Sequence, residues 1–138
     1  MRLILQVFLL LLFSISSAFA THFSDIQVIS LKKDELRKIL VKYDDKEKVL
    51  TFRWTLFKNG GLVMFNSYDT IVSQHILYMR QTNRSFRVQL KPSGVSFYNK
   101  PYVLIRFKDF NHDTNEAKLE LLLSDDSNHI KLEHVKNK

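Results

Sequence analysis

The sequence lacks cysteine altogether, and its 138 residues include only three glycines and two prolines. Without cysteine, the chain has no disulfide, zinc–thiolate site, iron–sulfur cluster, cysteine nucleophile or cysteine-linked lipid anchor. The scarcity of glycine also excludes phosphate-cradling glycine loops and the nucleophile elbow of hydrolases, which need closely spaced glycines. Small secreted domains of animals usually depend on disulfides, so an exported protein of this composition fits a bacterial periplasm better.

The composition is that of a folded protein. Hydrophobic residues make up 45% and charged residues 25%, which is neither a disordered nor a collagenous composition. The length suits one domain. Lys and Arg number 21 against 14 Asp and Glu, so the formal net charge is +7.

The first twenty residues have the three parts of a secretory signal peptide. Arg2 supplies positive charge, residues 3–13 form an apolar run broken only by Gln6, and an Ala-x-Ala sequence ends at Ala20. The alternative is an uncleaved anchor, but a spanning helix needs about 20 apolar residues. We therefore expect an exported protein, periplasmic or else extracellular, that begins at Thr21 and has no transmembrane span.

Alternation of apolar and polar residues predicts β-strands. In residues 48–58, Leu50, Phe52, Trp54 and Leu56 fall on one face, which we assign to the core. Asn59-Gly60 follows, a dipeptide typical of two-residue hairpin turns. This turn pairs residue 58 with residue 61, so the pattern predicts Leu56 opposite Val63 and Trp54 opposite Phe65.

A second hairpin is predicted around the polar residues 44–47. Pairing Tyr43 with Lys48 places Val41 opposite Leu50, which matches the apolar faces. The competing interpretation is a helix over residues 34–42, because some apolar residues there also have helical spacing.

Later segments alternate in the same way. Residues 86–90, 103–107 and 117–123 read as strands, residues 71–78 and 26–31 as further strands, and a turn at 125–128 would bring Leu123 opposite Ile130. Residues 62–65 and 121–123 are apolar on both faces, which favours central positions. The pattern predicts an all-β chain: a single antiparallel β-sandwich or small β-barrel of seven or eight strands over residues 21–138, with a frayed tail at 136–138.

An acidic loop overlaps the pattern of calcium-binding loops. Asp109, Asn111 and Asp113 alternate, and Glu120 stands at the twelfth position. Thr114 replaces the glycine that such a loop needs, and the flanks alternate as strands. A solvated hairpin turn is the favoured interpretation, and a weak calcium site is the alternative; no other cofactor is expected.

Catalytic and metal-binding motifs are otherwise lacking. The five histidines have neither the i, i+2 spacing of a strand site nor the i, i+4 spacing of a helical one. The acids fall in predicted turns, where solvation explains them. We therefore expect a non-catalytic protein, with a small hydrolase-type enzyme as the third choice.

Charge is the most informative feature left. Residues 70–108 contain seven basic residues and no acid, with aromatic residues interleaved, whereas residues 109–128 contain six acids and one lysine. These stretches can neutralise each other in an antiparallel fold, or the first can form a basic face for an anionic partner. Strand alternation directs Arg87, Arg106 and Lys108 outward, and Arg84 lies in a flanking turn. The predicted ligand-binding patch is therefore Arg84, Arg87, Arg106 and Lys108, with Tyr98 and Tyr102 nearby if the strands are adjacent.

The sequence thus predicts an exported, soluble binding or accessory module. Its expected partners are anionic lipid, lipopolysaccharide, a wall polymer or an acidic protein. Nucleic acid is not expected, because the protein is exported and RNA-binding signatures are missing. The alternative is a structural protein that joins an envelope assembly through an exposed sheet edge.

Overall fold

The computed structural model describes residues 22–90, 100–127 and 129–135. The predicted signal peptide, the predicted tail at 136–138 and Tyr98 lie outside these residues.

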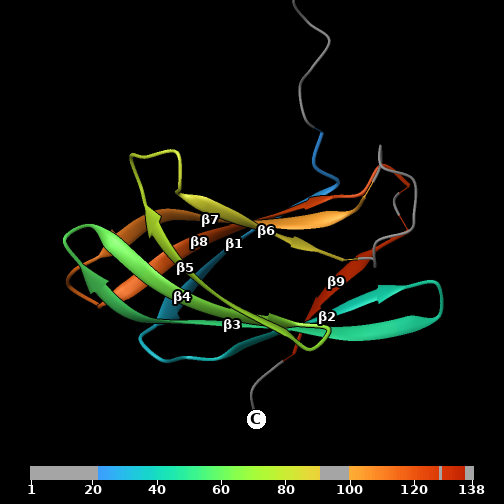
Figure 1. Ribbon diagram of the computed structural model, residues 1–138, viewed down its shortest axis with the longest axis horizontal. Helices are drawn as coiled ribbons and strands as arrows, with labels where there is room; N and C mark the ends of the chain where they lie inside the picture. Colours follow the sequence, from blue (N-terminus) through green and yellow to red (C-terminus); the bar gives the residue numbers. More distant parts are fainter. Residues whose placement is uncertain (1–21, 91–99, 128, 136–138) are drawn as a thin grey trace, which may run out of the picture.

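The described residues form nine strands and no helix, which confirms the all-β prediction. Two antiparallel sheets lie one above the other (Figure 1), with strand orders β1-β8-β7-β6 and β5-β4-β3-β2-β9. The central positions predicted for residues 62–65 and 121–123 are confirmed, because β4 and β8 each pair on both sides. The strands are β1 (Asp25–Lys32), β2 (Arg37–Tyr43), β3 (Lys46–Lys58), β4 (Gly61–Tyr68), β5 (Ile71–Tyr78), β6 (Ser85–Gln89), β7 (Tyr102–Asn111), β8 (Glu116–Ser124) and β9 (Lys131–His134).

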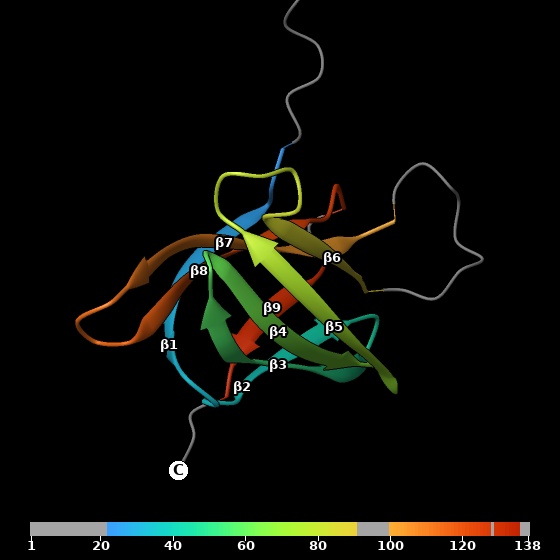
Figure 2. The same ribbon diagram turned by 60° about the vertical axis from the view of Figure 1, so that its left-hand side comes forward.

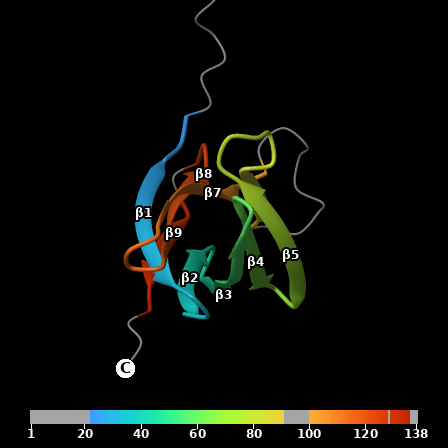
Figure 3. The same ribbon diagram turned by 90° about the vertical axis from the view of Figure 1, so that its left-hand side faces the viewer.

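The core lies between the sheets and is built from alternate residues of both. Trp54 and Phe52 of the five-stranded sheet and Phe107 of the four-stranded sheet are among its largest fully buried side chains. The end-on view in Figure 3 shows the two layers with β1 and β9 on one side and β5 on the other. Each strand therefore has one face in the core and one facing outward.

The Asn59-Gly60 hairpin forms as predicted, with Lys58 opposite Gly61 and Leu56 opposite Val63. The prediction fails further along, because a register shift between Trp54 and Leu56 places Trp54 opposite Met64. Trp54 is only 1% exposed, as predicted, but Leu56 is 49% exposed. A β-bulge inserts one extra residue, so the alternation changes face at this point.

The hairpin between β2 and β3 also forms, but in a different register. Tyr43 pairs with Lys46 and Val41 with Lys48, two residues away from the predicted pairing. The turn has two residues, Asp44 and Asp45, which both have positive φ, as a type I′ turn requires. A shift of two keeps every side chain on its predicted face. The competing helix over 34–42 is wrong, since β2 occupies this region.

The third predicted hairpin is wrong. β8 and β9 do not pair; β9 crosses to the other sheet and pairs with β2, so that Leu132 lies opposite Val41. The loop between them is held by the Asp125 carboxylate, which accepts hydrogen bonds from the Ile130 backbone N–H at 2.8 Å and from the Ser127 hydroxyl. This cap lies where the chain leaves the four-stranded sheet and crosses to the other.

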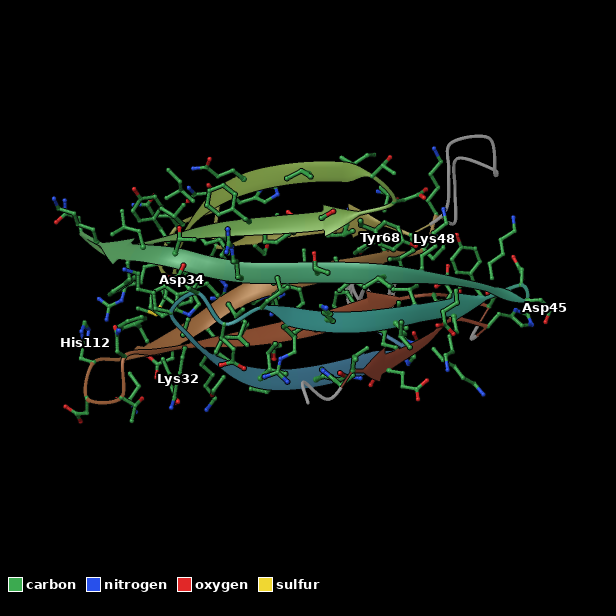
Figure 4. The ribbon with its side chains drawn as sticks, turned by 90° about the horizontal axis from the view of Figure 1, so that it is seen from below. Lys32, Asp34, Asp45, Lys48, Tyr68 and His112 are labelled. Atoms are coloured by element: carbon green, nitrogen blue, oxygen red, sulfur yellow. The ribbon has the colours of Figure 1, made fainter. Side chains whose placement is uncertain are left out.

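The two long sides of the sandwich differ. On the side of β1 and β9, the His134 ring contacts the Gln27 side chain, which joins the two edges. On the other side, where Figure 2 shows β5 beside β6, the His75 ring stacks on Phe86 with centroids 3.9 Å apart. Figure 4 shows His112 at one end of the molecule and Asp45 at the other.

Candidate cationic face

The outer face of the four-stranded sheet carries most of the predicted patch. Antiparallel pairing places Arg87 of β6 opposite Leu104 of β7, Leu104 opposite Leu122 of β8, and Leu122 opposite Ile26 of β1. Side chains of directly paired residues lie on the same face of a sheet. One row across this face therefore runs from a cation to three aliphatic side chains.

Arg87 and Tyr102 are brought together as the sequence predicted. The guanidinium carbon of Arg87 lies 4.5 Å from the centroid of the Tyr102 ring, a cation–π distance. Arg87 is exposed and Tyr102 is half-buried. The tyrosine thereby positions the guanidinium.

Arg106 and Lys108 are also adjacent, but both are paired with the same acid. Arg106 lies directly opposite Glu120, and each cation has a nitrogen 3.2 Å from a Glu120 carboxylate oxygen. A register shift between Phe107 and Asp109 lets the two basic residues reach one carboxylate. The local charge of this trio is +1, so the basic face is weaker here than the sequence alone indicated.

Arg84 lies at the edge of this face. It directly precedes β6, is exposed, and its backbone carbonyl accepts a 2.8 Å hydrogen bond from the Phe107 N–H. The next residue, Ser85, pairs with Arg106 on the outer face, so alternation places Arg84, one residue earlier, at the strand end and outside the row of cations. Tyr98, the sixth predicted member, falls outside the described residues.

The apolar half of this face was not predicted from the sequence. Ile26 is 56% exposed and Val28 of the same strand is 48% exposed. Both share a face with their partners Leu122 and Glu120, outside the core between the sheets, although Leu122 itself is only 4% exposed. The sequence does hold a sign of this apolar surface, because residues 121–123 are apolar on both faces of their strand. That pattern by itself indicates only a central strand.

The acidic loop forms the hairpin between β7 and β8. The Asn111 side-chain oxygen accepts hydrogen bonds from the backbone N–H groups of Asp113 and Thr114, and Asp109 accepts one from Phe110. Glu120 lies within β8 and engages the two cations above. No group of three or more His, Asp or Glu side chains that could hold a metal ion occurs in the described ranges.

A cleft of about 700 Å³ opens at the end of the sandwich that carries His112, which Figure 4 labels. Its aromatic lining is largely engaged in internal packing, because Phe57 stacks on Phe110 at 3.9 Å and Trp54 meets Phe110 edge-on. Lys33 and Lys58 also line it. The cleft thus combines packed aromatic groups with cations.

Two histidines have lowered pKa values. Burial lowers the pKa of His75, and burial together with the nearby Arg37 charge lowers that of His134. The neutral imidazole suits both positions, since one ring stacks on Phe86 and the other contacts Gln27.

No protein-family model, curated protein or solved structure matches this chain. Within the part of the chain that the structure describes, no helix is long and apolar enough to cross a membrane. A proposal about function therefore depends on the geometry of the chain itself.

Proposed function

We propose that this protein is an exported, non-catalytic binding module that applies the outer face of its four-stranded sheet to an anionic lipid surface of the cell envelope. The observation that carries the proposal is the row in which Arg87, held over Tyr102, continues through Leu104 and the buried Leu122 to the exposed Ile26. Charge, aromatic ring and aliphatic surface adjoin there on one face.

A lipid surface needs this combination. Anionic headgroups attract Lys and Arg near the surface by about 1 kcal/mol each. Tyrosine favours the boundary between headgroups and acyl chains, because its ring is apolar and its hydroxyl is polar. Exposed aliphatic residues such as Ile26 and Val28 gain from leaving water. A wall polymer or an acidic protein surface would use the cations but not this aliphatic half.

The balance of charge on the face supports an anionic partner. The pairings place two further acids on this face, Asp109 and Glu116, beside two further cations, Lys118 and Lys32. The third acid, Glu120, is 13% exposed and engages Arg106 and Lys108. Exposed charges contribute little singly, about 0–1 kcal/mol, so the cluster has to act together. Binding of this kind weakens with salt, because the Debye length falls from ~10 Å at 0.1 M to ~3 Å at 1 M ionic strength.

The test is co-sedimentation of the exported protein with phosphatidylglycerol vesicles, with phosphatidylcholine vesicles as the neutral comparison. We expect binding to the anionic vesicles alone, lost in high salt. The triple variant Arg84→Ser, Arg87→Ser, Arg106→Ser should bind between about 10- and 100-fold more weakly.

A matched control removes the same charge elsewhere. The variant Lys33→Ser, Lys38→Ser, Lys58→Ser has the same net charge as the first triple variant but leaves the face intact. It should bind within about threefold of the wild-type protein. Equal losses in the two variants, or binding that ignores salt, would overturn the proposal. Thermal unfolding of each variant shows that the fold is kept.

A further inference from the structure

β5 is an edge strand whose outer side no described strand covers. It pairs only with β4 in the five-stranded sheet. Figure 3 shows it at the outer side of its layer, opposite the side that holds β1 and β9. An open edge presents a row of backbone N–H and C=O groups to which a further strand can pair.

The other three edge strands are protected in ways that proteins commonly use. β6 has five residues and β9 has four, and both carry charged side chains. β1 begins at Asp25, ends at Lys32 and is joined to β9 through Gln27 and His134. Short length, charge and a covering contact each disfavour pairing with another chain.

β5 has little of this protection, because the only covering contacts among the described residues come from Asn83 at its C-terminal end, at Ile76 and Tyr78. It is eight residues long, and residues 70–79 include no Asp, Glu, Lys, Arg or Pro. Val72 is 72% exposed and Ile76 is 47% exposed. Strands of this kind are prone to pair edge to edge unless a partner already satisfies them.

Hydrogen bonds at one end of β5 show which residues face the open edge. The Tyr78 N–H donates to the Asn83 backbone carbonyl, and the Asn83 side-chain amide donates to the Ile76 carbonyl. Neither bond goes to β4. Because backbone groups alternate in direction along a strand, Val72 and Gln74 direct theirs to the same open side.

We propose that β5 pairs antiparallel with β5 of a second copy of this chain, centred on Gln74. In that register Gln74 lies opposite the partner's Gln74, and Val72 lies opposite the partner's Ile76. The sequence around Gln74 is close to palindromic in apolar character, with Val72 and Ile76 two residues to either side. The edge is therefore complementary to itself, as a twofold contact requires.

Two further features favour a second copy over a foreign strand. The chain carries a net charge of +7, and this uncharged edge is where two copies can approach with little repulsion. The outward row Leu56–Val63–Ile76 on β3, β4 and β5 would continue into the partner's Val72. Pairing thus extends an exposed apolar row instead of ending it.

The pairing itself does not depend on the proposed lipid binding, but it has a consequence for it. Directly paired residues share a face, so the two five-stranded sheets would join with their outer faces on the same side. Both four-stranded sheets then lie on the opposite side. A dimer would present its two cationic faces in the same direction, which would raise its avidity for a surface.

The test is sedimentation equilibrium of the exported protein without lipid, from about 0.1 M to about 1 M salt. We expect a monomer–dimer equilibrium that strengthens with salt, because screening reduces repulsion between cationic copies. Lipid binding should weaken over the same range, so failure of one proposal is distinguishable from failure of the other.

Two variants examine the edge. Val72→Lys places a charge on it, and Gln74→Pro removes an edge N–H, which an edge strand tolerates. Each should raise the dimer dissociation constant by at least about tenfold. The matched control is Val49→Lys, at a residue that is 44% exposed on β3, which has a strand on both sides. The control should leave the dissociation constant unchanged.

Three results would overturn the inference. The first is a monomer at about 100 µM in high salt. The second is a dimer that survives both edge variants, since its contact would lie elsewhere. The third is equal weakening by Val49→Lys, which would show that a sheet face and not the edge is used. Circular dichroism of each variant confirms that the fold is kept.

Discussion

The indole N–H of Trp54 on β3 donates a 2.8 Å hydrogen bond to the backbone carbonyl of Leu31 on β1, and this buried bond joins the two sheets. The Trp54 carbonyl in turn accepts a 2.9 Å bond from the Asp34 N–H. The segment that crosses between the sheets is therefore held by the side chain and the backbone of one tryptophan.

We expect Trp54→Phe to lower the free energy of unfolding by about 1–3 kcal/mol, because the Leu31 carbonyl loses its donor. Trp54→Ala should lower it by roughly 3–5 kcal/mol through the added cavity. Urea unfolding followed by far-UV circular dichroism measures both. Leu56→Ala is the control: its exposed side chain should contribute less than about 1 kcal/mol. A loss below about 1 kcal/mol in Trp54→Ala would contradict the buried position.

Sequence alternation predicted which face most strands bury, because a period of two is a direct consequence of strand geometry. It failed at Leu56, since a bulge changes the face without leaving a signal in side-chain polarity. The length of the Asp44-Asp45 turn could not be predicted from the sequence either. Two aspartates with positive φ make a two-residue turn, whereas the sequence suggested a polar turn of four.

The failure at β9 has a different cause. Leu132 is apolar and alternates correctly for either sheet, so its pattern could not choose between β8 and β2 as partner. In the structure the Asp125 carboxylate caps the loop that leads into β9, a contact that sequence periodicity does not encode.

The candidate site was predicted in part. Alternation placed Arg87 on the outer face and near Tyr102, and the structure agrees. It could not show that Glu120 lies opposite Arg106, because cross-strand partners depend on register. The aliphatic contribution of Ile26 became visible only when β1 was placed beside β8.

Asp125 should stabilise the crossing between the sheets. Replacement by Ala leaves the Ile130 N–H without its 2.8 Å acceptor, and we expect a loss of about 1–3 kcal/mol at neutral pH. Urea unfolding of Asp125→Ala measures it. Ser124→Ala, next to it at the end of β8, serves as control and should cost less than about 1 kcal/mol.

The same carboxyl should make stability depend on acid. Burial alone raises the pKa of Asp125, but hydrogen bonds from Ser127, Ile130 and His129 outweigh it, so the pKa is lowered. A depressed pKa means that the stabilisation is present above about pH 4, the ordinary value, and is lost as the pH falls through the folded value. The difference in free energy of unfolding between the wild-type protein and Asp125→Ala should therefore become smaller in acid. A constant difference down to about pH 2 would contradict this assignment.

Thr70 is strained in the turn between β4 and β5. Its φ of 68° lies in the left-handed region, which costs a β-branched residue about 1–2 kcal/mol. Thr70→Gly removes the strain but increases the entropy of the unfolded chain, so we expect a net gain of about 0.5–1 kcal/mol. Thr51→Gly in the middle of β3 should instead lose about 1 kcal/mol. Thermal unfolding compares the two, and a destabilised Thr70→Gly protein would count against the strain.

His75 should resist protonation. Its pKa is lowered by burial, and its ring stacks on Phe86. Stability from the neutral ring is present above the ordinary pKa of about 6.5 and is lost as the pH falls through the lower folded value. His75→Phe keeps a ring for stacking and cannot be protonated, so its stability relative to wild type should rise between about pH 7 and pH 5. An NMR titration midpoint of His75 at or above about 6.5 would contradict the prediction.

The aliphatic half of the cationic face should contribute to lipid affinity independently of charge. Ile26→Ser with Val28→Ser removes two exposed aliphatic side chains at 56% and 48% exposure. Partial burial of both in a lipid surface is worth about 1–3 kcal/mol, so binding to phosphatidylglycerol vesicles should weaken by about 5- to 100-fold. The slope of affinity against salt should stay unchanged, since no charge is lost, whereas the triple arginine variant should flatten it. Val49→Ser, at a residue that is 44% exposed on the other sheet, is the matched control and should bind as the wild-type protein does. Unchanged affinity in the Ile26 and Val28 double variant would show that only charge binds the headgroups. The aliphatic row would then not contribute to lipid binding.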